Sequence, residues 1–144
     1  MSLKTRDVHE FVVLAASAAR TANDNGSAVR LRTRPATVTF ILDVTAAATD
    51  AGDLLDVYIE SKLDGTNWTD VVRFTQITGT TVMPKRYVAN IVVDRTQTMF
   101  EVATGLGAAA ARHLLGDEYR ARWVVTDVVG DDASFTFSVQ ACPE

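Results

Sequence analysis

The sequence of 144 residues lacks several features on which common classes of protein depend. Cys142 is the only cysteine, so the chain can form neither an intrachain disulfide nor a thiolate zinc cluster. No apolar run approaches the roughly 20 residues that span a bilayer. The N-terminus shows no basic segment leading into an apolar stretch, so we expect no secretory signal and no membrane partner.

Positive charge is also scarce relative to negative charge. Lysine and arginine number 14 against 18 aspartates and glutamates, a formal net charge of −4. General nucleic-acid binding draws its affinity from excess lysine and arginine, so we expect no nucleic-acid partner. Apolar residues nevertheless make up 47% of the chain, which argues against intrinsic disorder. A chain of this length can bury a core as one domain.

Apolar residues recur with period two, the pattern of half-buried β-strands. Residues 37–44, for example, place alternate apolar side chains on one face, and Asp64-Gly65-Thr66-Asn67 is a strong turn signal. On these grounds eight strands are predicted, at 29–34, 37–44, 55–60, 68–76, 86–93, 98–104, 119–125 and 134–140. The pattern predicts an all-β protein, an eight-stranded jelly-roll-like β-sandwich.

Two segments depart from this pattern. Residues 107–116 contain four consecutive alanines and predict a tight loop or, at most, one short helix. Residues 1–27 are interpreted as an N-terminal arm and linker, and residues 28–144 as the sandwich domain. The centre of the arm is apolar, and its candidate partner-binding residues are Phe11, Val12, Val13 and Leu14. Two arrangements remain open: an extra edge strand on the same domain, or a strand added to a neighbouring subunit.

The sequence contains no recognisable catalytic constellation. Its two histidines, His9 and His113, lie outside any motif, and no Gly-x-Ser-x-Gly segment is present. Residues 64–70 carry oxygen ligands at alternating positions, but the closing glutamate of a calcium loop is missing, so a plain turn is favoured. Asp131 and Asp132 could add ligands if the two loops met. We therefore expect a non-enzymatic protein without a cofactor or bound metal.

Arginine and tryptophan offer the remaining candidate binding groups. Arg30, Arg32 and Arg34 share one face of a predicted strand, either as a solvated, ion-paired surface or as a docking stripe for an acidic protein surface. Trp68 and Trp123 are in phase with apolar neighbours and are predicted to anchor the core. An exposed pair of aromatic residues on one sheet face would instead favour carbohydrate binding.

Two stretches of the sequence are familiar as strand-and-turn patterns. They are Leu55-Asp56-Val57-Tyr58-Ile59-Glu60-Ser61-Lys62-Leu63-Asp64-Gly65-Thr66-Asn67-Trp68-Thr69-Asp70, and residues 115–125 followed by Ala133-Ser134-Phe135-Thr136-Phe137-Ser138-Val139. The first resembles a segment common in small tailed-phage virion proteins, and the second resembles their closing hairpin. This resemblance points to the capsid decoration (cement) proteins. It covers less than half of the chain.

The resemblance implies a structural protein that is made in the host cytoplasm and sits on the outside of the capsid. Such a protein clamps neighbouring capsomers, and its partners would be the major capsid protein and further copies of itself, often as a trimer. On this hypothesis residues 1–20 reach a neighbour, and Arg30, Arg32 and Arg34 contact the shell. The alternatives are another virion component, such as a tail or connector protein, and a carbohydrate-binding β-sandwich module.

Overall fold

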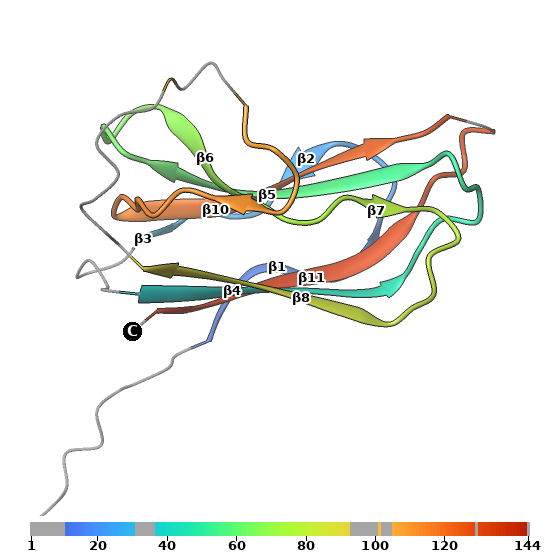
Figure 1. Cartoon of the computed structure of the whole chain (residues 1–144), viewed down its shortest axis with the longest axis horizontal. Helices are drawn as coiled ribbons and strands as arrows, with labels where there is room; N and C mark the ends of the chain where they lie inside the picture. The colour runs from blue at the N-terminus through green and yellow to red at the C-terminus, as the bar shows by residue number, and fades with distance from the viewer. Residues whose placement is uncertain (1–10, 31–36, 93–100, 102–104, 129, 144) are drawn as a thin grey trace, which may run out of the picture.

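The computed structural model of the chain describes residues 11–30, 37–92, 101, 105–128 and 130–143. This part of the chain contains no helix and forms two antiparallel β-sheets that face each other as a β-sandwich (Figure 1). The predicted all-β sandwich is therefore confirmed. The predicted loop or helix at 107–116 is a turn at 108–109 followed by a two-residue strand, without a helix.

Each sheet combines strands from distant parts of the sequence. The four-stranded sheet has the order β1 (Val12–Arg20), β11 (Phe135–Pro143), β4 (Thr37–Ala46) and β8 (Lys85–Val92). The seven-stranded sheet has the order β2 (Asp24–Asn25), β10 (Glu118–Thr126), β5 (Leu54–Lys62), β6 (Trp68–Arg73) and β9 (Ala110–Ala111), with β3 (Val29–Arg30) on β10 and β7 (Ile77–Thr78) on β5.

The strand order is that of a jelly roll. Strands β2 and β3 pair with different parts of β10 and count as one interrupted strand. If the two-residue strands β7 and β9 are left out, eight strands remain in the described part of the chain. Numbered 1 to 8 in chain order, these strands lie in the order 1-8-3-6 in the four-stranded sheet and 2-7-4-5 in the other sheet. This is the arrangement of two interleaved Greek keys. The predicted strand at 98–104 is not one of them, since all of it except Glu101 lies outside the described residues.

The core lies between the sheets and follows the alternation of the sequence. The buried row of β4 faces the buried row of β10, and two aromatic pairs join the sheets: Phe40 with Tyr119 at 5.8 Å between ring centroids, and Phe137 with Trp123 at 5.5 Å. Both pairs are edge-to-face, the favoured geometry for aromatic rings. Burial raises the pKa of Tyr119 to about 12. Trp123 therefore anchors the core as predicted.

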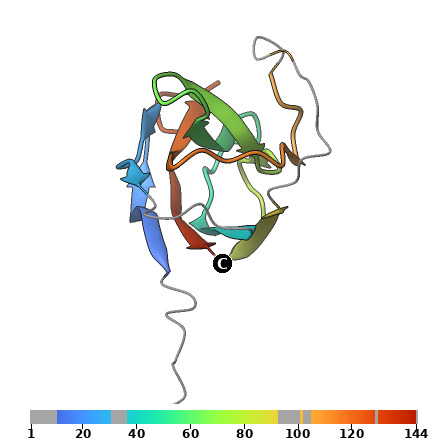
Figure 2. The same cartoon turned by 90° about the vertical axis from the view of Figure 1, so that its left-hand side faces the viewer.

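The segment predicted as an arm contributes an edge strand to this same chain. Residues 12–20 form β1, which pairs antiparallel with β11, and Figure 2 shows β1 in blue at the margin of its sheet opposite β8. Leu14 and Ala15 are buried in the core. This is the edge-strand arrangement that the sequence left open, and the described sandwich begins at Val12 rather than at residue 28. Residues 1–10 lie outside the described part.

Gly26 allows the two sheets to approach each other at β1. Its backbone N–H donates to the Ala121 carbonyl at 2.9 Å, and a Cβ at this position would lie 2.0 Å from the Leu14 carbonyl oxygen. We expect Gly26→Ala to lower the free energy of unfolding by about 1–2 kcal/mol, because a backbone contact must give way. Urea denaturation measures the change. Gly107→Ala is the matched control, since a Cβ there meets nothing within 4 Å; equal losses in both variants would contradict the explanation.

Candidate functional site

The outer face of the four-stranded sheet carries several exposed apolar side chains. The strand registers place Val13, Gln140, Ile41 and Val88 in one row across all four strands. The alternate residues of β4 and β11 fill the core, so this row points away from it. Side chains directly opposite one another on neighbouring strands are in contact range. The outer apolar face is defined here by the apolar Val13, Ile41, Val88 and Val92, together with the polar but uncharged Thr39, Asn90 and Gln140 between them.

Charge is confined to one end of this sheet surface. Asp43 and Arg86 form a bidentate ion pair, with Arg86 Nε 2.6 Å from Asp43 Oδ1 and Nη2 3.0 Å from Oδ2. The carboxylate raises the pKa of Arg86, first through the side-chain hydrogen bonds and then through its charge. The residues that define the outer apolar face carry no charge.

Several large apolar side chains are exposed on or beside this face. Val13 is 54% exposed, Val88 60% and Val92 50%, and Phe11, which directly precedes β1, is 60% exposed. Single exposed apolar residues are normal on a soluble protein. Several of them on one uncharged sheet surface are typical of a protein–protein contact, because the centre of such an interface is depleted of charge.

The structure separates the predicted partner-binding residues into different environments. Phe11 and Val13 are exposed, Val12 is half-buried, and Leu14 is buried in the core. Leu14 is thus in place to stabilise the fold and is not free to contact a partner. Sequence reasoning missed Ile41 and Val88. In the alternating segments 37–44 and 86–93, both residues occupy outward positions, where a polar side chain is expected, and this departure from the pattern could have identified them.

Of the predicted arginine stripe, the structure describes only Arg30, which lies on the other sheet. Arg30 belongs to β3, which pairs with β10, and its Nη2 is 3.6 Å from Glu118 Oε2. The Arg30 side chain is 73% exposed, so this ion pair is weak. Arg32 and Arg34 lie outside the described residues. The structure therefore does not bring Arg30 together with the apolar residues 11–14.

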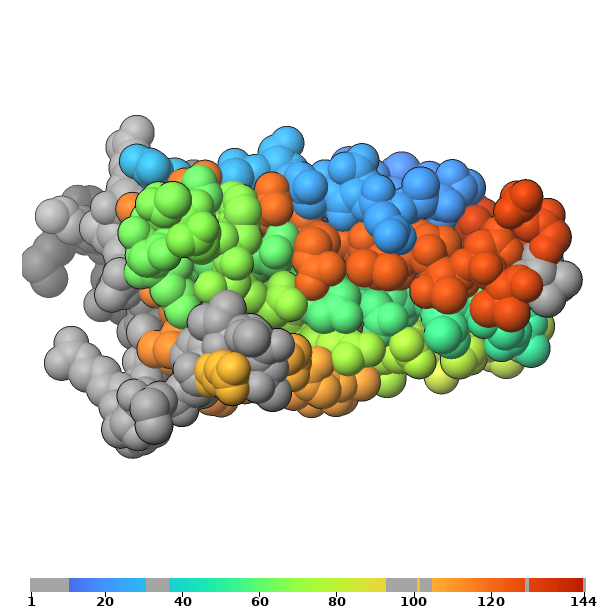
Figure 3. All heavy atoms as spheres, turned by 90° about the horizontal axis from the view of Figure 1, so that it is seen from above, coloured from blue at the N-terminus to red at the C-terminus, as the bar shows by residue number. Residues whose placement is uncertain are grey.

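The outer face of the seven-stranded sheet is a network of ion pairs. Figure 3 looks onto this side of the molecule, where β10 in orange runs between β2 in blue and β5 and β6 in green. Glu60 accepts from Arg120 at 3.0 Å and lies 3.4 Å from Arg122, which also donates to Asp70 at 3.0 Å. Arg73 forms a further ion pair on this face, with its Nη2 2.9 Å from Asp56 Oδ1. These charges are largely neutralised within the sheet.

Trp68 lies on this charged face, and the prediction that it anchors the core is wrong. The ladder between β5 and β6 pairs Glu60 with Asp70 but Ile59 with Val72, so Val71 is an extra residue in a β-bulge. The bulge reverses which side chains face inward, and both Val71 and Val72 are buried. Trp68 consequently points outward.

The outward-facing aromatic rings of this face are half-buried and are covered by cations. Arg120 lies 4.2 Å and Lys62 4.9 Å from the ring centroid of Trp68. Arg122 lies 4.0 Å from the ring centroid of Tyr58. Such contacts are typical cation–π interactions. Guanidinium groups thus occupy the stacking faces that a sugar ring would need.

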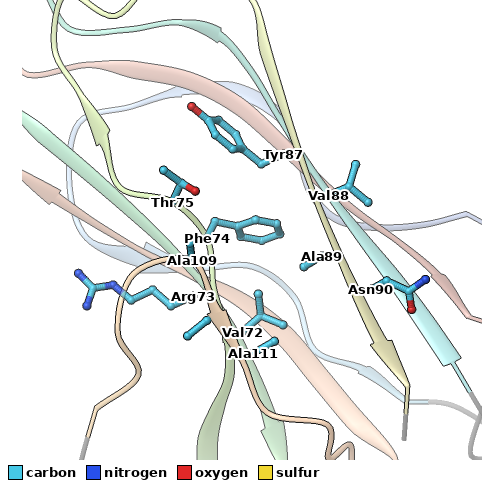
Figure 4. A pocket seen from close by; sticks show the side chains of 11 residues that line it. Val72, Arg73, Phe74, Thr75, Tyr87, Val88, Ala89, Asn90, Ala109 and Ala111 are labelled. Carbon is cyan, nitrogen blue, oxygen red and sulfur yellow. The ribbon is translucent and has the colours of Figure 1, made fainter.

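A shallow pocket of about 220 Å³ opens between the sheets beside β8 (Figure 4). Its described lining is mostly apolar or neutral, with Phe74 and Ala89 near its centre and Arg73 at its side.

His113 does not line this pocket. Its Nδ1 lies 3.2 Å from the backbone N and 3.1 Å from the backbone O of Val92. Backbone groups therefore hold this imidazole, and His9 lies outside the described residues.

In the turn at 64–67, hydrogen bonds from the turn itself satisfy the carboxylate of Asp64. Asp64 Oδ1 accepts from the backbone N–H groups of Thr66 at 2.8 Å and Asn67 at 2.7 Å, and Oδ2 accepts from Asn67 Nδ2 at 2.9 Å. These bonds lower the pKa of Asp64 to about 2. Asp70 is engaged by Arg122, and Asp132 lies in a loop at the opposite end of the sandwich (Figure 1). The geometry is that of a plain Asx turn.

The chain matches no protein-family model, no curated protein and no solved structure. Within the described residues, no helix has the length and apolar character to cross a membrane. Of the surfaces described above, the outer apolar face differs most from an ordinary solvated sheet.

Proposed function

We propose that the protein is a structural virion component, a capsid decoration protein that binds the outside of the shell through its outer apolar face. The observation that carries this proposal is the uncharged row of Val13, Gln140, Ile41 and Val88 across the four-stranded sheet. An antiparallel sheet face in contact with water normally alternates polar side chains outward. A face without charges loses less solvation energy than a charged face when a partner covers it, and polar side chains such as Gln140 would need hydrogen-bond partners there.

The rest of the sheet supports a binding role for this face. The uncharged row would form the centre of the contact, and the Asp43–Arg86 pair would lie at its rim, the usual anatomy of an interface. The sandwich behind it is rigid, because the opposite faces of β4 and β11 are packed into the core. Phe11 directly precedes β1 and is 60% exposed, so it is available to add to the contact with the shell or with a second copy of this chain.

The two alternatives receive different support. A tail or connector protein would use the same face for another virion partner, so only the partner distinguishes it from a decoration protein. A carbohydrate-binding module would need bare aromatic rings, whereas the rings of Trp68 and Tyr58 are covered by arginine side chains. The described aromatic residues therefore favour a protein partner over a glycan.

Substitution of a glutamate for Val88 tests the proposal. Val88→Glu introduces a charge at the centre of the face, and we expect it to weaken binding to shells of the major capsid protein by about tenfold or more. The position is exposed, so thermal unfolding should be unchanged. Co-sedimentation with assembled shells, run in parallel with purified tails, measures the effect and identifies the partner.

Val82→Glu is the matched control for this experiment. Val82 is 82% exposed and lies in the loop before β8, outside the outer apolar face. It should bind shells like the unmodified protein. Binding that is unaffected by Val88→Glu, or weakened equally by Val82→Glu, would contradict a role for this face. Binding to tails alone would support the tail or connector alternative.

A further inference from the structure

Three carboxylates meet at the end of the sandwich opposite the 64–67 turn. Asp50 and Asp53 belong to the loop between β4 and β5, and Asp132 belongs to the loop between β10 and β11, at the right-hand end in Figure 1. One carboxylate oxygen from each residue lies within 4.8 Å of the others. More than half of the chain separates Asp50 from Asp132, so the fold alone creates this aspartate cluster (Asp50, Asp53 and Asp132).

Asp53 supplies an observation beyond the clustering itself. Its side chain is fully buried, and its Oδ1 accepts from the backbone N–H of Val128 at 2.9 Å. Its Oδ2 is also buried but has no hydrogen-bond partner. A buried polar atom without a partner is costly and rare in folded proteins. An ion bound between the carboxylates would satisfy it.

Positive charge is missing from the same place. Among the described residues, none of the ion pairs of this protein involves a member of the aspartate cluster. Asp127, in the same loop as Asp132, adds a further carboxylate, whose Oδ2 accepts from the backbone N–H of Ala133 at 3.1 Å. Mutual repulsion of these like charges opposes the observed arrangement, and a bound cation would offset it.

Backbone hydrogen bonds hold the aspartate cluster in position. Asp53 N–H donates to the Asp50 carbonyl at 3.1 Å, and Gly79 N–H donates to the Asp53 carbonyl at 2.8 Å. A Cβ on Gly79 would lie 1.8 Å from the Asp50 carbonyl oxygen, so the loop packs tightly against the β7 turn. The carboxylates are therefore pre-positioned by the fold, which reduces the cost of ordering them around a ligand.

We propose that Asp50, Asp53 and Asp132 form a calcium site that links the β4–β5 loop to the β10–β11 loop. Calcium takes oxygen ligands at about 2.3–2.6 Å, so two ligands of one ion lie at most about 5 Å apart, which the spacing of these oxygens fits. Magnesium requires ligands at about 2.1 Å in near-ideal octahedral geometry. Zinc prefers nitrogen and sulfur ligands, which this cluster does not offer.

Calcium binding to the isolated full-length protein tests this proposal independently of the proposed function. After treatment with a chelator, we expect about 5 mM Ca²⁺ to raise the Tm by about 5 °C, as for a site of submillimolar affinity. The same concentration of Mg²⁺ should raise it much less. Isothermal titration should show one calcium site per chain. The absence of both the Tm shift and the binding heat would overturn the proposal.

Two variants identify the ligands. Asp53→Asn keeps an oxygen that can accept from Val128 and removes the charge, and it should abolish the calcium-dependent Tm shift. Asp132→Asn, at an exposed position, should weaken calcium binding about tenfold or more even if Asp53→Asn fails to fold. The control is Asp64→Asn, in the turn whose sequence resembles a calcium loop, which should respond like the unmodified protein.

Each remaining outcome is decisive. A calcium affinity that is unchanged in Asp132→Asn, or a calcium response that is lost in Asp64→Asn, would place the bound ion elsewhere and overturn the site. An equal response to magnesium and calcium would overturn the assignment to calcium. None of these results depends on shell binding, so the calcium site and the proposed function can fail separately.

Discussion

Deletion of residues 1–20 is expected to destabilise the sandwich by about 4 kcal/mol or more, because it removes the whole of β1. Leu14 and Ala15 belong to the core, and loss of a buried leucine side chain alone costs about 2–5 kcal/mol. The deletion also removes the strand that pairs with one edge of β11. A strand that loses its edge partner exposes unpaired N–H and C=O groups and favours aggregation.

Deletion of residues 1–10 is the matched control, since it keeps β1 intact. Its free energy of unfolding should exceed that of the Δ1–20 protein, because it keeps Leu14, Ala15 and the pairing with β11, and urea denaturation followed by tryptophan fluorescence compares the two deletions. A Δ1–20 protein as stable as the full chain would show that β1 contributes little. If β1 were instead exchanged between subunits, the Tm of the full chain would depend on protein concentration.

Most of the fold could be predicted because its strands are half-buried. The alternation in residues 37–44 and 134–140 marks the rows that fill the core, and the structure places those rows inside. The N-terminal segment is different, because alanines occupy both faces of β1 and no alternation distinguishes an edge strand from an arm. Trp68 was misplaced for a third reason: one bulged residue, Val71, reverses the inward and outward faces of β6.

The candidate surfaces depend on contacts that a sequence does not display. Phe11 and Val13 could be proposed from the apolar N-terminal segment alone. Ile41 and Val88 become part of the same surface only when the strand registers bring them into one row. Likewise, Asp53 and Asp132 meet because the jelly-roll order places the β4–β5 and β10–β11 loops at the same end of the sandwich.

Glu60→Ala is expected to lower the free energy of unfolding by about 3 kcal/mol, because it breaks the ion-pair network at its most buried member. The Glu60 side chain is only 9% exposed, and its carboxylate is shared by Arg120 and Arg122. Arg122 keeps Asp70 as a partner, but Arg120 loses its only described ion-pair partner while its guanidinium lies over the Trp68 ring. Both arginines are partly exposed to solvent, so the expected loss of stability lies at the lower end of the range observed when one partner of a buried ion pair is removed.

Asp43→Ala provides the comparison, since it removes the carboxylate of a bidentate pair whose arginine, Arg86, is 64% exposed. We expect a loss below about 1 kcal/mol, which added salt should reduce further. Urea denaturation of both variants at low and high salt measures the difference. Equal, salt-sensitive losses would mean that the arginines beside Glu60 are solvated surface groups. Arg120 and Arg122 would then be free to dock on an acidic partner, and the seven-stranded sheet would compete with the outer apolar face as the binding surface.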